Sequence, residues 1–132
     1  MSNSSTENNI NPQEVWLAKF PYEEDSTKYK IRPVMVLQEV SEKQMMSVLE
    51  IETNEPSYIS VKVTKHKVRL DDPYDTEIIK WKEANLDKKS VARVSKTINL
   101  PESQFVRKIG IADDEDFVRI LTKFIEFLND NI

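Results

Sequence analysis

The chain has 132 residues, which fits one domain with a sizeable core, and its 39% hydrophobic and 32% charged residues are typical of a soluble globular protein. The absence of cysteine excludes disulfides, cysteine nucleophiles and thiolate zinc sites, and the single histidine, His66, excludes a pair of imidazoles as acid and base within one chain. The formal net charge of −4 predicts that a polyanion would bind only at a local basic patch. We expect a cytoplasmic protein without membrane contact, because the sequence has neither a long apolar run nor a signal segment.

The first half of the sequence predicts a tail followed by four strands. Residues 1–12 are small and polar without a hydrophobic period, so we expect disorder there and a single domain over 13–132. The segment 14–21 is largely apolar on both faces, which suits a central strand, and Pro21 ends it. A polar loop is expected at 22–31. The remaining strands are predicted at 33–40, 46–53 and 58–64.

The second half predicts mainly helices. Asp75 can cap a short insert helix that ends at Asn85, a residue that tolerates the left-handed conformation in a chain with only one glycine, Gly110. A strand is predicted at 90–95 and a single helical turn at 100–105. The last segment starts with acidic residues, which suit a helix N-terminus. It carries an apolar stripe at helical spacing, made of Phe117, Ile120, Leu121, Phe124 and Leu128.

Together these elements predict a β-rich α+β fold. It contains about five short strands, a small insert helix and a C-terminal amphipathic helix that packs across the sheet. Because the connections between strands are short, most of the pairing is expected to be antiparallel.

Two polar side chains at strand ends are candidates for binding phosphate. Pro33 holds Arg32 in an extended conformation, so that its guanidinium projects from a rigid strand start. The alternative is a surface ion pair between Arg32 and one of the loop acids Glu23, Glu24 and Asp25. Thr53 ends the third predicted strand, where its hydroxyl can donate to a phosphate oxygen or simply serve as a β-branched strand residue.

Arg93 and Ser95 share one face of the strand predicted at 90–95. An arginine in the middle of a strand indicates either a functional sheet face or an ion pair with a neighbouring strand, and the sequence leaves both open.

The segment "KVTKHKVR" (62–69) is the most basic stretch. It is a candidate wall of a nucleic-acid groove, and equally a charged strand edge that resists aggregation. The acidic groups "DDPYD" and "DDED" resemble metal ligands, but a turn with a helix cap explains the first and the charge of a helix N-terminus explains the second. No metal site is therefore assigned.

The order of several motifs resembles the MazF/PemK family of type II toxin–antitoxin toxins. "EVWLAKFP" is similar to the opening strand of that family, and "IRPVMVL" to its Arg-Pro-Val strand. "WKEANLDKKSVARVSKTINLPESQFVRKIGIADDEDF" resembles the later block of the family, up to the acidic start of its last helix.

The resemblance implies a small, strongly twisted, barrel-like antiparallel sheet with a C-terminal helix, usually in a homodimer. It also implies an endoribonuclease that uses no metal or cofactor and cuts single-stranded RNA at short sequences, leaving a 2′,3′-cyclic phosphate and a 5′-OH. The family pattern assigns catalytic roles to Arg32, Thr53 and, in the PemK/Kid branch, Arg93. The RNA-binding residues expected around them are Lys30, Lys62, Lys65, His66, Lys67 and Ser95.

We expect a disordered, acidic antitoxin segment to cover the groove formed by "KVTKHKVR", Lys30 and Arg32, and we expect Met45, Met46 and the end of the last helix to contribute to the dimer. The sequence departs from the family pattern at Gln13, in the 22–31 loop, where Ser26 stands in place of a histidine and "TKYKI" replaces a Glu-Gln-x-Gly pattern, and at Ser95 in place of an aspartate. Two alternatives therefore remain, namely a non-catalytic small-barrel module that binds nucleic acid or protein and a gyrase poison of the CcdB type.

Overall fold

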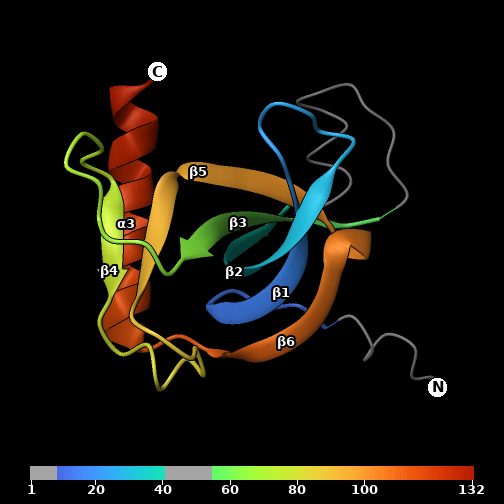
Figure 1. Ribbon diagram of the computed structural model, residues 1–132, viewed down its shortest axis with the longest axis horizontal. Helices are drawn as coiled ribbons and strands as arrows, with labels where there is room; N and C mark the ends of the chain where they lie inside the picture. Colours follow the sequence, from blue (N-terminus) through green and yellow to red (C-terminus); the bar gives the residue numbers. More distant parts are fainter. Residues whose placement is uncertain (1–8, 41–54) are drawn as a thin grey trace.

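The computed structural model describes residues 9–40 and 55–132. This part of the chain forms six strands, a short 3-10 helix and one α-helix (Figure 1). In chain order the elements are β1 (Glu14–Pro21), β2 (Tyr29–Val40), β3 (Ser57–Thr64), β4 (Asp75–Ile78), β5 (Ser90–Pro101), η1 (Glu102–Gln104), β6 (Phe105–Ile111) and α3 (Asp114–Asp130). The strand predicted at 46–53 lies outside the described residues.

The strands form one sheet in the order β4-β5-β3-β2-β1-β6, and every neighbouring pair is antiparallel, which confirms the predicted fold class. The sheet is not closed into a barrel, because β4 and β6 are its two edges. It is nevertheless strongly curved, and β5 and β6 bend around the pair of β1 and β2 in Figure 1. An irregularity in the β3–β5 pairing accompanies the bend: Lys62 pairs with Arg93, whereas Ser60 already pairs with Ile98.

Two clusters of buried apolar side chains cover opposite faces of this sheet. Val15 and Met35 belong to the first cluster, while the adjacent Trp16 and Val34 belong to the second. Because successive side chains of a strand point to opposite faces, the clusters lie on either side of the sheet. Ile10, within the predicted tail, also packs in the second cluster, so that residues just before β1 contact the domain.

Helix α3 covers the first cluster and lies against β4 and β5 (Figure 1). Four members of the predicted apolar stripe, Phe117, Ile120, Leu121 and Phe124, pack on this cluster. The fifth, Leu128, is 44% exposed, and Phe127 packs there instead. Across residues 9–40 and 55–132, no helix is both long enough and apolar enough to cross a membrane.

The insert helix predicted after Asp75 is wrong. Residues Asp75–Ile78 form the edge strand β4, and turns occupy 79–85. Glu77 is exposed between the buried Thr76 and Ile78, an alternation that a strand produces. Pairing with β5 thus outweighs a weak local helix propensity. The left-handed conformation predicted for Asn85 is confirmed by its φ of 66°, although the residue closes a series of turns and not a helix.

The chain's single glycine marks a close approach between β6 and the 79–85 turns. A Cβ atom on Gly110 would lie only 2.6 Å from the carbonyl oxygen of Ala84. The side chain of Asn85 donates to the Ile109 carbonyl oxygen at 3.1 Å, which holds the turn in place. The sequence pattern did not predict β6 as a strand, because it is an edge strand with apolar residues on its exposed side, whereas the helical turn predicted just before it is confirmed as η1.

Candidate functional site

Arg32 lies inside β2 and not at the start of this strand, as the sequence had suggested. The strand begins at Tyr29, within the segment predicted to be a loop, and pairs with β1 through Arg32 and Pro33. Arg32 is opposite Ala18 and is partly exposed. The strand therefore fixes the backbone on both sides of this arginine.

No carboxylate among the described residues forms an ion pair with Arg32. Of the loop acids considered as partners, Glu23 pairs with Lys96 at 2.8 Å, and Asp25 accepts hydrogen bonds from the backbone and hydroxyl of Thr27. The hydrogen bond and charge of Lys96 also lower the pKa of Glu23. In the described part of the chain, the guanidinium of Arg32 thus lacks an internal counter-ion and is available to an anionic ligand.

Lys62 is the centre of a basic face that also includes Arg32, Arg93 and Lys96. Burial is the main cause that lowers the pKa of Lys62, and the charge of Arg32 adds to it. Glu23 acts in the opposite direction, while Arg93 and Lys96 lower the pKa further. Three adjacent strands, β2, β3 and β5, thus direct basic side chains to the same place.

Arg93 forms an ion pair with a buried carboxylate on the neighbouring strand. It is 8% exposed and donates to Asp75 of β4. Asp75 also accepts hydrogen bonds from the backbone N, Nε and Nη2 of Arg69, at 2.8, 3.0 and 2.9 Å. Burial alone would raise the pKa of Asp75, but the hydrogen bonds of Arg69 and the charges of both arginines outweigh it and lower the pKa. Of the two readings left open for Arg93, the ion pair with a neighbouring strand is present.

Ser95 is part of the same network. Its hydroxyl donates to Asp72, and Arg69 pairs with that carboxylate at 2.8 Å. Asp72 also accepts a hydrogen bond from the backbone N of Tyr74 at 2.9 Å, which confirms the turn predicted for "DDPYD". The polar groups of Arg93 and Ser95 thus hold the 69–75 segment on β5.

A pocket of about 350 Å³ lies where β2 begins and β3 ends. Lys30, Arg32, Lys65 and His66 all line it, so four of the predicted site residues meet there. Asp87 contributes the acidic part of the lining and pairs with Lys65 at 3.2 Å. The predicted Lys67 lies beyond this pocket and lines the next hollow, of about 700 Å³, together with Trp81.

Three residues that were assigned roles from the sequence, Thr53, Met45 and Met46, lie outside the described residues.

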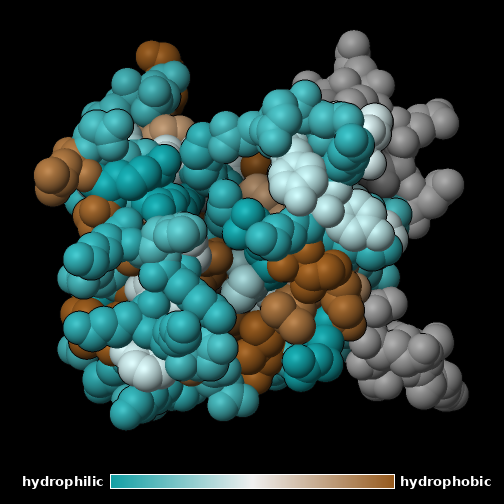
Figure 2. Space-filling model, viewed as in Figure 1, coloured by the Kyte–Doolittle hydropathy of each residue, from teal (hydrophilic) through white to brown (hydrophobic). Residues whose placement is uncertain are grey.

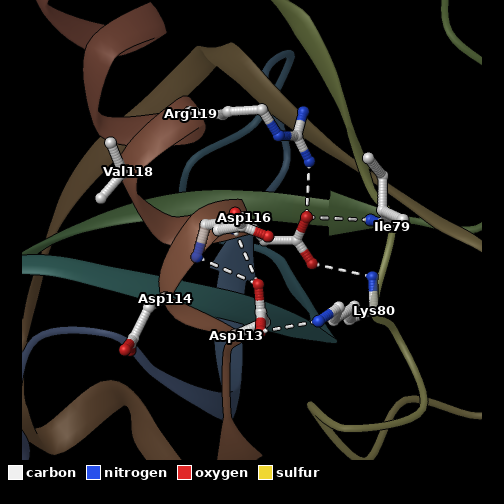
Figure 3. Close-up of a pocket in the computed structure, with 8 residues that line it drawn as sticks. Ile79, Lys80, Asp113, Asp114, Asp116, Val118 and Arg119 are labelled. Carbon is white, nitrogen blue, oxygen red and sulfur yellow. Dashed lines mark hydrogen bonds and ion pairs between the residues drawn. The ribbon is translucent and has the colours of Figure 1, made fainter.

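Two acidic residues at the start of α3 cap the helix and hold the turn that follows β4 (Figure 3). Asp113 accepts hydrogen bonds from the backbone N of Glu115 and Asp116, as predicted for a helix N-terminus. Asp116 is 1% exposed, accepts from the backbone N of Ile79 and Lys80 at 3.1 and 2.8 Å, and pairs with Arg119. Among the residues the structure describes, no group of three or more histidine, aspartate or glutamate side chains is placed to hold a metal ion.

Sequence reasoning missed the partners that complete the site. An arginine in mid-strand was a usable signal for a buried acid on an adjacent strand, and Asp75 is that acid. The contact between Lys96 and Glu23 joins β5 to the β1–β2 loop, two segments that are distant in the sequence, and no local pattern announces it.

Comparison with known proteins agrees with the predicted resemblance. The family model of PemK-like, MazF-like toxins of type II toxin–antitoxin systems matches residues 11–128. Among solved structures, the chain is similar to the Mycobacterium tuberculosis toxin MazF-mt6, with a TM-score of 0.55 and 15% sequence identity over 88% of this chain and 96% of that one. At this identity, the structural match shows a shared fold. No curated protein sequence is significantly similar to the chain.

Replacing Asp75 by asparagine should destabilise the fold strongly. The change leaves the buried Arg93 without its counter-charge and leaves Arg69 with Asp72 alone, so we expect a loss of about 3 kcal/mol in the free energy of unfolding. Because the pKa of Asp75 is lowered in the folded state, its contribution is complete above the unfolded-state pKa of about 3.9 and is lost as the pH falls through the folded-state value. Urea unfolding of the native chain and of Asp75→Asn should thus show a difference in the free energy of unfolding that is constant near neutral pH and becomes smaller below about pH 4.

The matched control is Asp71→Asn, which removes an exposed neighbouring acid and should change stability by less than about 0.5 kcal/mol. Equal stability of Asp75→Asn and the native chain near pH 7 would contradict the role given to this carboxylate.

Proposed function

Because the chain belongs to the family of PemK-like, MazF-like toxins of type II toxin–antitoxin systems, we propose that it is an endoribonuclease that cleaves single-stranded RNA. The observation that carries this proposal is the position of Arg32, which has no acidic partner among the described residues and lies beside Lys62 and a basic pocket. A phosphodiester is the anion that such a guanidinium binds well, through two parallel hydrogen bonds.

The proposed reaction is an internal transfer at phosphorus. The ribose 2′-oxygen attacks the adjacent phosphorus and loses its proton, and the bond to the 5′-oxygen breaks. The products are a 2′,3′-cyclic phosphate and a 5′-OH, and the reaction needs no metal. Negative charge builds on the non-bridging oxygens in the transition state, so donors fixed around them are the main catalytic requirement.

Arg32 supplies the first of these donors. Its strand position and its neighbour Pro33 restrict the backbone, so little reorganisation accompanies the reaction. Thr53 supplies a second, neutral donor, as the family pattern implies. Arg93 contributes positive potential from its place opposite Lys62, while Asp75 holds its guanidinium.

Beyond the reacting phosphate, the RNA strand follows Lys30, Lys65 and His66 around the pocket and reaches Lys67. These exposed basic side chains contact the backbone of the RNA and give affinity with little dependence on sequence. Such a toxin acts on cellular RNA, and we therefore place it in the cytoplasm.

Arg32→Ala should lower the cleavage rate far more than the affinity for RNA. The guanidinium gains strength as charge develops on the phosphorus oxygens, so its loss costs about 3 kcal/mol of transition-state stabilisation, or roughly a hundredfold in rate. Arg32→Lys should restore little, because a point charge does not reproduce the fork, and Thr53→Ala should cost less than Arg32→Ala. The measurement is cleavage of a mixed single-stranded RNA in EDTA, with the products analysed for 2′,3′-cyclic ends.

The control is Arg107→Ala, which removes an exposed arginine on β6 and should leave the rate unchanged. Full activity of Arg32→Ala, or activity that disappears with chelator, would rule out this mechanism. Induced expression separates the alternatives: growth arrest with intact RNA indicates a gyrase poison, and normal growth indicates a non-catalytic binding module.

We propose that the toxin is a homodimer that pairs through the edge strand β6. Val106 and Ile111 on the edge strand β6 are 51% and 52% exposed. Figure 2 shows an apolar patch in the area of β1 and β6 on an otherwise mostly hydrophilic face. Exposed apolar surface of this kind marks association sites. Light scattering at micromolar concentration should give the mass of two chains, and Val106→Lys should shift it towards one chain, whereas a monomeric native protein would refute the proposal.

We propose that a disordered, acidic segment of the antitoxin covers the basic pocket and the adjacent Lys67. An acidic segment complements the cations that line these hollows on a protein whose net charge is −4. Its affinity should therefore fall as salt rises to physiological strength, and it should compete with RNA. Titration of the cognate antitoxin at several salt concentrations measures this, with Lys67→Ala expected to reduce the salt dependence. An affinity that does not change with salt would contradict this mode of binding.

A further inference from the structure

Lys62 occupies the middle of the basic face. Its strand, β3, lies between β5 and β2, and Lys62 pairs directly with Arg93 on one side and with Val34 on the other. Arg32 lies two residues before Val34 and so points to the same face of the sheet, as a diagonal neighbour of Lys62. A phosphate held by Arg32 would thus bring its ester oxygens near the amine of Lys62.

The groups around Lys62 are nearly all apolar or positive. Phe20 of β1 places its ring centroid 5.8 Å from Nζ. Arg32 faces it from β2, and Arg93 and Lys96 face it from β5. The acid that acts on it is Glu23 of the β1–β2 loop, which pairs with Lys96 at 2.8 Å. Within residues 9–40 and 55–132, no carboxylate forms an ion pair with Lys62 itself.

These surroundings make the ammonium of Lys62 a stronger acid than an ordinary lysine. Burial is the larger cause, and the charge of Arg32 the next, so the pKa is lowered. Proton donors in the transition state become more effective as their pKa approaches the working pH. The other basic members of the face are less suited to this role, because an arginine side chain is a poor proton donor in proteins and Lys96 forms an ion pair with Glu23.

We propose that Lys62 is the general acid of the proposed RNA cleavage, and that its ammonium gives a proton to the 5′-oxygen as that oxygen leaves phosphorus. This inference rests on the proposed function. In the same step, the 2′-oxygen loses its proton to water and bonds to phosphorus, and the bond between phosphorus and the 5′-oxygen breaks. The neutral amine of Lys62 then regains a proton from water, so that the enzyme returns to its starting state.

The acid role fits this site better than the base role. The ammonium is the usual form of a lysine side chain at neutral pH, and this is the form that donates a proton. The leaving 5′-oxygen is the atom that most needs a proton, because an alkoxide is a poor leaving group. This chain carries Ser95 of β5 where the family pattern has an aspartate, and Lys62 fills the role from the adjacent strand β3.

The test compares Lys62→Arg with the native chain on an RNA whose cleavage site has been mapped. Arginine keeps the charge and the contact with RNA but does not release a proton, so binding should hold while the rate falls roughly a hundredfold. In the native chain, kcat/KM should fall as the pH rises through the pKa of Lys62, which lies below 10.5, and this limb should be absent in the variant. The control is Lys123→Arg on α3, which is distant in the sequence from Lys62 and should behave like the native chain.

A second substrate isolates the protonation step. An RNA with a bridging sulfur in place of the 5′-oxygen has a leaving group that needs no proton, so Lys62→Arg should cleave it nearly as fast as the native chain. Arg32→Ala should remain slow on both substrates, because it acts on the non-bridging oxygens. Lys62→Gln provides a second variant with the same expected rescue, and urea unfolding checks that both variants fold.

The outcomes separate this inference from the function it rests on. If the native chain cleaves no RNA, the proposed function fails and the inference fails with it. If the native chain cleaves and Lys62→Arg keeps its rate and its alkaline limb, or remains slow on the sulfur substrate, only the role of Lys62 is overturned.

Discussion

Asp75 brings one negative charge to a place where two arginines meet. Its carboxylate accepts hydrogen bonds from Arg69 and Arg93, so it joins the 69–75 segment to β4 and β5. A buried carboxylate is costly unless it is fully bonded, and here four donors satisfy it. The contact joins β4 to β5 at the residue pair Asp75 and Arg93, and Arg93 in turn lies opposite Lys62 of β3. The basic face therefore depends on an acid that lies outside it.

This arrangement explains how an acidic chain can present a basic site. The acids that lie near the site are already bound: Asp72 and Asp75 by Arg69, and Glu23 by Lys96. Acids at the start of α3 are used for capping and for holding the 79–80 turn. Local charge, rather than the net charge of −4, thus determines what approaches Arg32.

The hydrophobic pattern of the sequence predicted the elements whose apolar side chains recur at the spacing of a strand or a helix. The alternation in β3, the apolar run in β1 and the helical stripe of α3 each report which face meets the core, and the structure has all three elements. The sequence also directed attention to Arg32, because Pro33 restricts its backbone. It misjudged the segment after Asp75, where strand pairing and a distant ion pair with Arg93 outweigh a helix cap. Partnerships of that kind join residues far apart in the chain, and a local window does not contain them.

The contacts of Ser95 in the structure explain one departure from the family pattern. Ser95 stands where related toxins carry an aspartate, and its hydroxyl donates to Asp72, so a carboxylate still lies at this point of the sheet. That carboxylate is neutralised by Arg69, however, and so takes part in structure instead of proton transfer. Asp72 and Asp75 are bound by Arg69, and Asp87 in the pocket lining pairs with Lys65, so cations predominate among the described charged side chains around the phosphate site. A cation that releases its proton is then the natural source of acid catalysis, and among these cations the partly buried Lys62 is the one whose surroundings favour that release.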